Sequence, residues 1–309
     1  MIAANGLSKQ YGTKLAVDQL SFTVRPGVVT GFLGPNGSGK STTMRMIMGL
    51  DAPTGGDVTV NGRHYHDLAW PLHEVGALLE AKAIHPGRSA RAHLRMLAET
   101  NHLPLTRIDE VLEIVGLTSV GGQRAGKFSL GMGQRLGIAA ALLGDPEVLL
   151  FDEPVNGLDP DGIRWVRNLL KSLAREGRTV FVSSHLMSEM ALTADEVVII
   201  GRGRLISQIP VDDLVNQSSQ RFVRVRSPEL EKLRRALESE GATTTLEDDG
   251  SLTVRGKDEA AIGELAASLP IALHELSPQS ASLEEAFMEL TESSVEYHGA
   301  ATASGGNAQ

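Results

Sequence analysis

One stretch of the chain has residue types and spacing suited to holding phosphate. Residues 34–42 read Gly-Pro-Asn-Gly-Ser-Gly-Lys-Ser-Thr and fit the pattern G-x-x-x-x-G-K-[ST]. Glycines let the backbone curl and aim its N–H groups at an anion, and a helix starting directly after the loop adds its own unpaired donors. In this pattern Lys40 reaches the β- and γ-phosphates, and the Ser41 hydroxyl ligates Mg²⁺.

The context of this loop separates it from a Gly-rich turn that matches by chance. An apolar run over residues 28–33 predicts a strand before it, and residues 42–48 predict a helix after it. The predicted phosphate-binding residues are Gly34, Pro35, Asn36, Gly37, Ser38, Gly39, Lys40, Ser41 and Thr42.

A pair of carboxylates follows a second apolar run. Residues 148–151 predict a buried central strand, and Asp152 and Glu153 come directly after it. Ligands of open α/β sheets bind at that end of the strands. There Asp152 is a candidate for holding Mg²⁺, and Glu153 for polarising an attacking water. The alternative is a strand-end cap or a surface acidic pair.

Other polar residues stand at similar positions. Glu80 ends a predicted strand over residues 75–79, and His185 follows one over residues 179–184. A lone His is most often structural, but at a shared sheet edge a γ-phosphate contact is credible. Asp159 suits the N-cap of the next helix, with Pro160 in its first position. A small, polar, Gly-containing segment, residues 128–135, opens another helix.

The alternation of strands and helices predicts an α/β fold with a mostly parallel core sheet. Residues 1–25 predict antiparallel strands of a flanking sheet, and residues 89–144 a helical subdomain, in which Thr106 and Asp109 form a candidate capping pair. After Arg221 the order β-α-β-β-α-β predicts a small ferredoxin-like α+β module. We expect domains over residues 1–215 and 220–292 and a disordered tail over 293–309.

Composition excludes several classes of protein. The 309 residues include no cysteine, which rules out a disulfide framework, a thiolate metal site and a Cys nucleophile. The net charge is −9 and aromatic residues make up 4%, which disfavours nucleic-acid binding. No run approaches the ~18 apolar residues of a membrane span, and no signal peptide is expected. The C-terminal module shows no catalytic constellation, which favours a structural appendage or dimer contact over ligand sensing.

Taken in order, these features resemble the ATP-binding subunits of ABC transporters from Met1 to about Pro210. That family has a Walker A, a Q-loop, a signature, a Walker B, a D-loop and an H-loop. The matching positions here are residues 34–42, Glu80, residues 129–135, residues 148–153, residues 157–159 and His185. The variants are similar to those of the drug- and antibiotic-export branch, whose membrane subunits are separate chains.

The resemblance implies a role for each matching residue. Tyr11 would stack on adenine, Glu153 would be the catalytic base, and His185 would contact the γ-phosphate. ATP and Mg²⁺ are the implied cofactors. Two copies would sandwich two ATP molecules, so that Ser129 and Gly131 act in trans and Asp159 signals across the interface. The implied partner is a separate transmembrane permease at the cytoplasmic face of the membrane, with residues 80–95 contacting it and no nucleic acid involved.

Two departures from the family pattern leave alternatives open. The family usually has Gln where this chain has Glu80, which either ligates Mg²⁺ more strongly or serves only in coupling. The usual Leu-Ser-Gly-Gly-Gln is Phe-Ser-Leu-Gly-Met over residues 128–132. Beside an exporter ATPase, the alternatives are a soluble ABC-type ATPase acting on nucleic acid or ribosomes, and a regulatory ATP-binding protein.

Overall fold

The computed structural model describes residues 1–80, 84–217, 222–279 and 283–291, so the predicted tail over 293–309 lies outside the described residues. These residues divide into two compact units, one built mainly from Met1–Val211 and the other from Asp212–Leu290. No helix among the described ranges is long and apolar enough to cross a bilayer.

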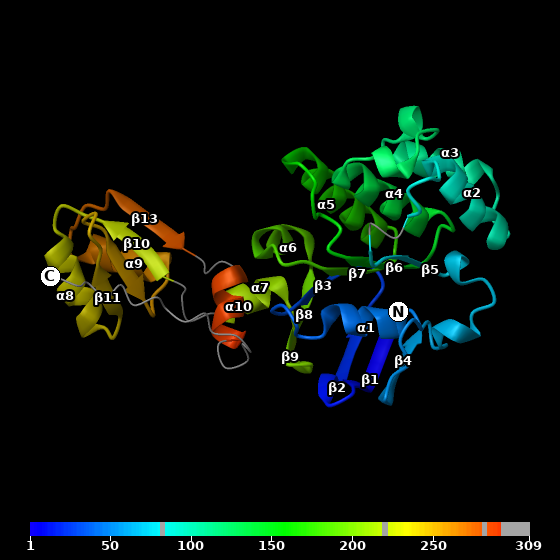
Figure 1. Cartoon of the computed structure of the whole chain (residues 1–309). Coiled ribbons are helices and arrows are strands. Elements are labelled where there is room, and N and C mark those ends of the chain that lie inside the picture. The colour runs from blue at the N-terminus through cyan, green and yellow to red at the C-terminus, as the bar shows by residue number, and fades with distance from the viewer. Residues whose placement is uncertain (81–83, 218–221, 280–282, 292–309) are drawn as a thin grey trace, which may run out of the picture. The chain divides into compact units, whose positions relative to one another are not determined.

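A six-stranded sheet forms the centre of the larger unit (Figure 1). Its order is β5 (Val75–Leu78), β6 (Val148–Asp152), β7 (Thr179–Ser183), β3 (Val29–Leu33), β8 (Glu196–Gly201) and β9 (Arg204–Pro210). The first five strands are parallel, and only β9 runs antiparallel to its neighbour. β3 and β7 are buried along their whole length, as their apolar sequences require of central strands. The predicted parallel core sheet is confirmed.

A second, antiparallel sheet lies over one face of the core, as predicted. It contains β2 (Lys14–Val24), β1 (Ile2–Tyr11) and β4 (Gly55–Val60), in that order. Helix α1 (Lys40–Ile47) contacts strands of both sheets. The rings of Phe22, Phe32 and Phe181 also join the sheets, with centroids 4.9 to 5.7 Å apart. Helices α5 (Pro160–Arg175) and α6 (Met187–Thr193) contact β3 of the core sheet.

The predicted helical region consists of α2 (Ala90–Thr100), α3 (Thr106–Ile114) and α4 (Leu130–Leu142). Short 3₁₀ turns lie at Tyr65–Asp67, Pro71–His73, Thr118–Val120 and Ala125–Lys127. The predicted capping pair of α3 is wrong. The N-cap residue is Leu105, and the Asp109 carboxylate pairs with Arg91 at 2.5 Å instead of closing the helix end.

The smaller unit has the predicted ferredoxin-like order. Its antiparallel sheet runs β11 (Thr243–Leu246), β12 (Leu252–Arg255), β10 (Phe222–Arg226) and β13 (Glu275–Gln279). Residues from β10, β12, α8 (Leu230–Ser239) and α9 (Glu259–Ser268) form a core of its own, including the buried Val225, Leu237 and Ile262. Helices α7 (Val211–Gln217) and α10 (Leu283–Thr291) complete the described elements.

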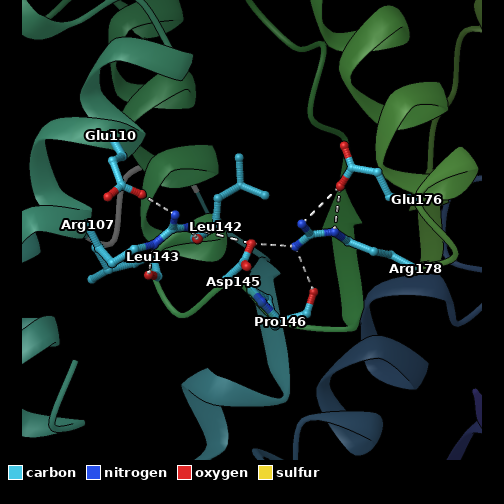
Figure 2. A network of polar contacts seen from close by, with 8 residues as sticks. All are labelled: Arg107, Glu110, Leu142, Leu143, Asp145, Pro146, Glu176 and Arg178. Carbon is cyan, nitrogen blue, oxygen red and sulfur yellow. Dashed lines mark hydrogen bonds and ion pairs between the residues drawn. The ribbon is translucent and has the colours of Figure 1, made fainter. Parts of the chain in front are cut away.

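An ion-pair network ties the helical region to the core sheet (Figure 2). Arg107 of α3 donates to the carbonyl oxygens of Leu142 and Leu143 at 3.0 and 3.2 Å, and so satisfies acceptors left free at the end of α4. Asp145, just beyond α4, lies 3.6 Å from Arg107 and 2.9 Å from Arg178, which precedes β7. Asp145 therefore connects α3 with the start of a core strand.

We predict that Asp145→Asn weakens this connection without straining the backbone, because Asn tolerates the left-handed conformation (φ 55°) of Asp145. Exposed ion pairs contribute little, so the expected loss is about 0.5–1 kcal/mol, or roughly 1–4 °C in melting temperature. Thermal unfolding at low and high salt measures it, and high salt should shrink the difference.

Asp161→Asn is the matched control, because the pair of Asp161 with Arg164 lies within one helix and is exposed. An equal loss in both variants, or no loss in Asp145→Asn, would contradict a connecting role.

Candidate active site

A cavity of about 880 Å³ lies where the parallel strands of the core sheet end. It brings together most of the residues predicted from sequence. Those lining it are Tyr11, Asn36, Gly37, Gly39, Lys40, Ser41, Thr42, Glu80, Asp152, Glu153 and His185. Its size suits a ligand of nucleotide dimensions.

The loop between β3 and α1 has the geometry of a phosphate cradle. Gly37 and Gly39 have φ values of 81° and 106°, which favour glycine. A Cβ on Gly39 would lie 2.6 Å from the carbonyl oxygen of Ala16, so the loop cannot carry a side chain there. The Ser38 hydroxyl is buried in the loop without a hydrogen-bond partner.

Lys40 points its ammonium group into this loop. Nζ donates to the carbonyl oxygens of Gly34 and Pro35 at 2.6 and 3.3 Å. Burial lowers the pKa of Lys40, while the nearby carboxylates of Glu153 and Asp152 act in the opposite direction. The charged form is thus costly unless anionic groups surround it, which suits contact with phosphate.

Asp152 is held between two hydroxyl groups. The Ser41 hydroxyl donates to one carboxylate oxygen at 2.8 Å, and the Ser183 hydroxyl donates to the other. Ser183 lies opposite Asp152 in the register of β6 and β7. Hard oxygen donors of this kind fit Mg²⁺. No group of three or more His, Cys, Asp or Glu suitable for a metal occurs among the described residues, so phosphate and water oxygens would have to complete a shell.

Glu153 and His185 form a second pair across the same strand ends. The Glu153 carboxylate lies 2.7 Å from the Nδ1 atom of His185 and accepts from its backbone N–H at 3.3 Å. Glu153 itself has a φ of 52°, a conformation uncommon for a residue with a side chain. The pair can accept a proton from a bound water and hold the imidazole in a fixed orientation.

Tyr11 stands at the rim of the cavity and is half exposed. Its hydroxyl donates to Asp51 at 2.8 Å, and Arg45 pairs with the same carboxylate at 2.7 Å. The hydrogen bond from Arg45, and then that from Tyr11, lowers the pKa of Asp51 to about 2. The bond to Asp51 in turn raises the pKa of Tyr11. The phenol therefore stays neutral with its ring held in place.

Some predicted residues lie outside this cavity. Gly34, Pro35 and Ser38 belong to the loop but do not line the cavity. Ser129 lines a separate groove of about 360 Å³ and caps α4 by accepting from the Met132 N–H at 3.2 Å. Asp159 caps α5, as predicted, by accepting from Gly162 at 2.8 Å. Gly131 lies against the Gly157 carbonyl, 3.2 Å from where a Cβ would be.

Several lining residues were not predicted: Lys14, Ala16, Leu79, Leu130, Gln134 and Asn156. Leu130 and Gln134 lie in the segment that opens α4, which the sequence had already marked as a candidate anion site. Lys14 and Ala16 come from β2, and nothing in the sequence marked them, because only the packing of the second sheet brings them to the loop.

Comparisons with known proteins assign the family. The profile of the ABC transporter family matches residues 17–156. YhcH of Bacillus subtilis (strain 168), described as an uncharacterized ABC transporter ATP-binding protein, is 38% identical over 94% of this chain and 96% of its own. The chain belongs to the family of ABC transporter ATP-binding proteins. As a member of this family it is an ATP-binding subunit with ATPase activity.

Other relatives and solved structures agree. The bacitracin transport ATP-binding protein BcrA of Bacillus licheniformis is 45% identical over 69% of this chain and 71% of its own. A solved ATP-binding subunit of an ABC transporter is 26% identical, covers 70% of this chain and 92% of its own, and has a TM-score of 0.64. Residues 221–284 match a domain of unknown function.

We predict that Asp51→Asn lowers the pKa of Tyr11 toward its ordinary value of about 10, because the phenol loses its acceptor carboxylate. Because the pKa of Tyr11 is raised in the folded protein, its hydrogen bond to Asp51 stabilises the fold fully below pH ~10. This stabilisation is lost as the pH rises through the raised pKa. The ultraviolet absorbance of tyrosinate, followed through an alkaline titration, measures the shift.

The chain has three tyrosines, and the part of the titration curve that disappears in Tyr11→Phe is that of Tyr11. If Asp51→Asn titrates like the unaltered protein, the Tyr11–Asp51 hydrogen bond does not exist in solution.

Proposed function

We propose that this ABC-family subunit hydrolyses ATP in the cavity described above and powers an exporter through a separate membrane subunit. The observation that carries the catalytic part is the convergence of three groups at one sheet edge. These are the phosphate loop with Lys40, the Ser41–Asp152 pair, and the Glu153–His185 pair.

Each group has a distinct task in this proposal. The loop N–H groups and Lys40 bind the phosphates and orient the γ-phosphorus for in-line attack. Glu153 accepts a hydrogen bond from the attacking water and takes up its proton. His185, fixed 2.7 Å from the Glu153 carboxylate, holds that side chain and contacts the γ-phosphate. Tyr11 provides a flat face for adenine.

Metal binding is the second part of the proposal. Ser41 and Asp152 would hold Mg²⁺, which when bound neutralises phosphate charge. Three carboxylates, those of Glu80, Asp152 and Glu153, line the cavity near Lys40, so a bare triphosphate would meet like charge. The pKa of Arg45 is raised, first by its hydrogen bond to Asp51 and also by the charge of Glu80. We assign Glu80 to Mg²⁺ binding or to coupling.

The working unit in this proposal is a homodimer that sandwiches two ATP molecules. Ser129 and Gly131 lie beside the catalytic cavity of their own subunit rather than lining it, which is consistent with their acting on the partner's nucleotide. Asp159 would then signal across the interface. The membrane subunit would be contacted around residues 80–95 on the cytoplasmic face of the membrane.

Transport of antibiotic peptides is supported by relatives named for it, the bacitracin transport ATP-binding proteins of two species and the lantibiotic transport ATP-binding protein SrtF of Streptococcus pyogenes. Export as the direction is supported by the linearmycin resistance ATP-binding protein LnrL of Bacillus subtilis (strain 168), because resistance fits removal of the compound from the cell. The module after residue 220 is proposed as an accessory structural domain or dimer contact.

We predict that Glu153→Gln lowers the turnover number for ATP by about 10²–10³-fold, because the amide cannot take up the proton of water. ATP binding should persist, and gel filtration with ATP should show an accumulated dimer. Phosphate release and nucleotide titration measure the two effects separately.

Glu189→Gln is the matched control, because the Glu189 side chain is also 24% exposed and also pairs with a basic residue. Unchanged turnover in Glu153→Gln would remove Glu153 as the base.

We also predict that the tagged protein, extracted from its host's membranes in mild detergent, co-purifies with a multi-spanning protein in stoichiometric amount. Recovery from the cytosol alone, or together with ribosomes, would overturn the transporter proposal.

A further inference from the structure

The backbone of Glu153 is held in an uncommon conformation by three hydrogen bonds. Its φ of 52° lies in the left-handed region, which a residue with a side chain adopts only when its surroundings enforce it. The Glu153 N–H donates to the Ser183 hydroxyl at 3.1 Å. Its carbonyl oxygen accepts from the Gln134 side chain at 2.7 Å and from the Asn156 N–H at 3.2 Å.

Gln134 differs from the other two partners in where it comes from. Ser183 belongs to the strand beside β6, and Asn156 lies three residues further along the same turn. Gln134 belongs to α4, on the helical region, and reaches Glu153 from 19 residues away. It is therefore the partner through which α4 acts on the backbone of the proposed base.

The environment of Gln134 makes this contact strong and specific. The residue is 3% exposed, and a buried amide group needs a partner because its desolvation is costly. Leu130 stands one helical turn earlier on the same face of α4, and both side chains line the cavity. The helix begins at Leu130 and is capped by Ser129, which belongs to the family signature. One rigid element thus carries the signature at its start and the Glu153 contact in its second turn.

We propose that Gln134 is a positioning residue for ATP hydrolysis, which holds the Glu153 backbone so that its carboxylate faces the cavity and His185. This inference rests on the proposed function of Glu153 as the base. Gln134 touches the backbone of Glu153 and not the reacting atoms, so its loss leaves the phosphate loop and the Ser41–Asp152 pair unchanged.

The test is Gln134→Met, which keeps the length of the side chain and removes the amide donor. We expect the turnover number to fall about tenfold or more, since small displacements of a catalytic group are costly in rate. The dissociation constant for a fluorescent ATP analogue should stay within about twofold. If Gln134→Met is insoluble, Gln134→Leu removes the same donor in a good helix former.

Gln208→Met is the matched control. The amide of Gln208 also donates to a backbone carbonyl, that of Thr23, at 2.7 Å, and it lies on β9, where it does not line the cavity. Both variants should melt at lower temperature than the unaltered protein, but only Gln134→Met should lose turnover. Equal turnover in Gln134→Met and Gln208→Met would overturn the proposal and leave Gln134 a structural residue.

A double variant separates this proposal from the one on which it rests. If Gln134 acts through Glu153, Gln134→Met added to Glu153→Gln causes no further loss in single-turnover rate. A further loss of tenfold would show that Gln134 acts elsewhere. If Glu153→Gln alone keeps full turnover, the proposed function of Glu153 fails first. If Glu153→Gln is inactive but Gln134→Met is fully active, only the present inference fails.

Discussion

The parallel register of β3, β6 and β7 is the constraint on which the site depends. In this register Phe32 and Asp152 both lie opposite Ser183, so the three strands end at one level. The phosphate loop, the Asp152–Glu153 pair and His185 each follow one of these ends. A slip of one residue would turn the side chains of a strand to the opposite face and separate the pairs.

The aromatic packing under the site supports this register. Phe32 and Phe181 lie on adjacent core strands, and Phe22 joins them from the antiparallel sheet. Such pairs prefer defined geometries, and the well-packed interior leaves little room for sliding. The same contact brings β2 close to the loop, where Ala16 limits the space around Gly39. The antiparallel sheet thus shapes the phosphate loop.

The departures from the usual family sequence have local structural consequences. Leu130, which stands where the family has Gly, lies over the turn at Gly157, where a Cβ would come within 2.2 Å of the leucine side chain. Its side chain is about half exposed and lines the cavity. Glu80 brings a third carboxylate to the same cavity. Both residues therefore contribute to the charge and shape of the cavity wall.

The sequence by itself determined the phosphate loop, the strand that leads into it, and the polar residues at the strand ends. These follow from local rules: glycines permit the loop conformation, apolar runs form buried strands, and parallel strands end at one edge. The cap of α5 by Asp159 was predictable for the same reason, because both partners lie within one turn.

Only the tertiary structure decided the contacts between residues far apart in the chain. Strand β9, the Ser183–Asp152 bond and the Gln134–Glu153 bond were not predicted, and the capping pair at Thr106 was wrong because Arg91 of another helix binds Asp109. A hydrogen-bonding side chain can bind many groups of the same chemistry, so its sequence does not identify its partner. The packing of the layers determines which of these groups lies within hydrogen-bonding distance.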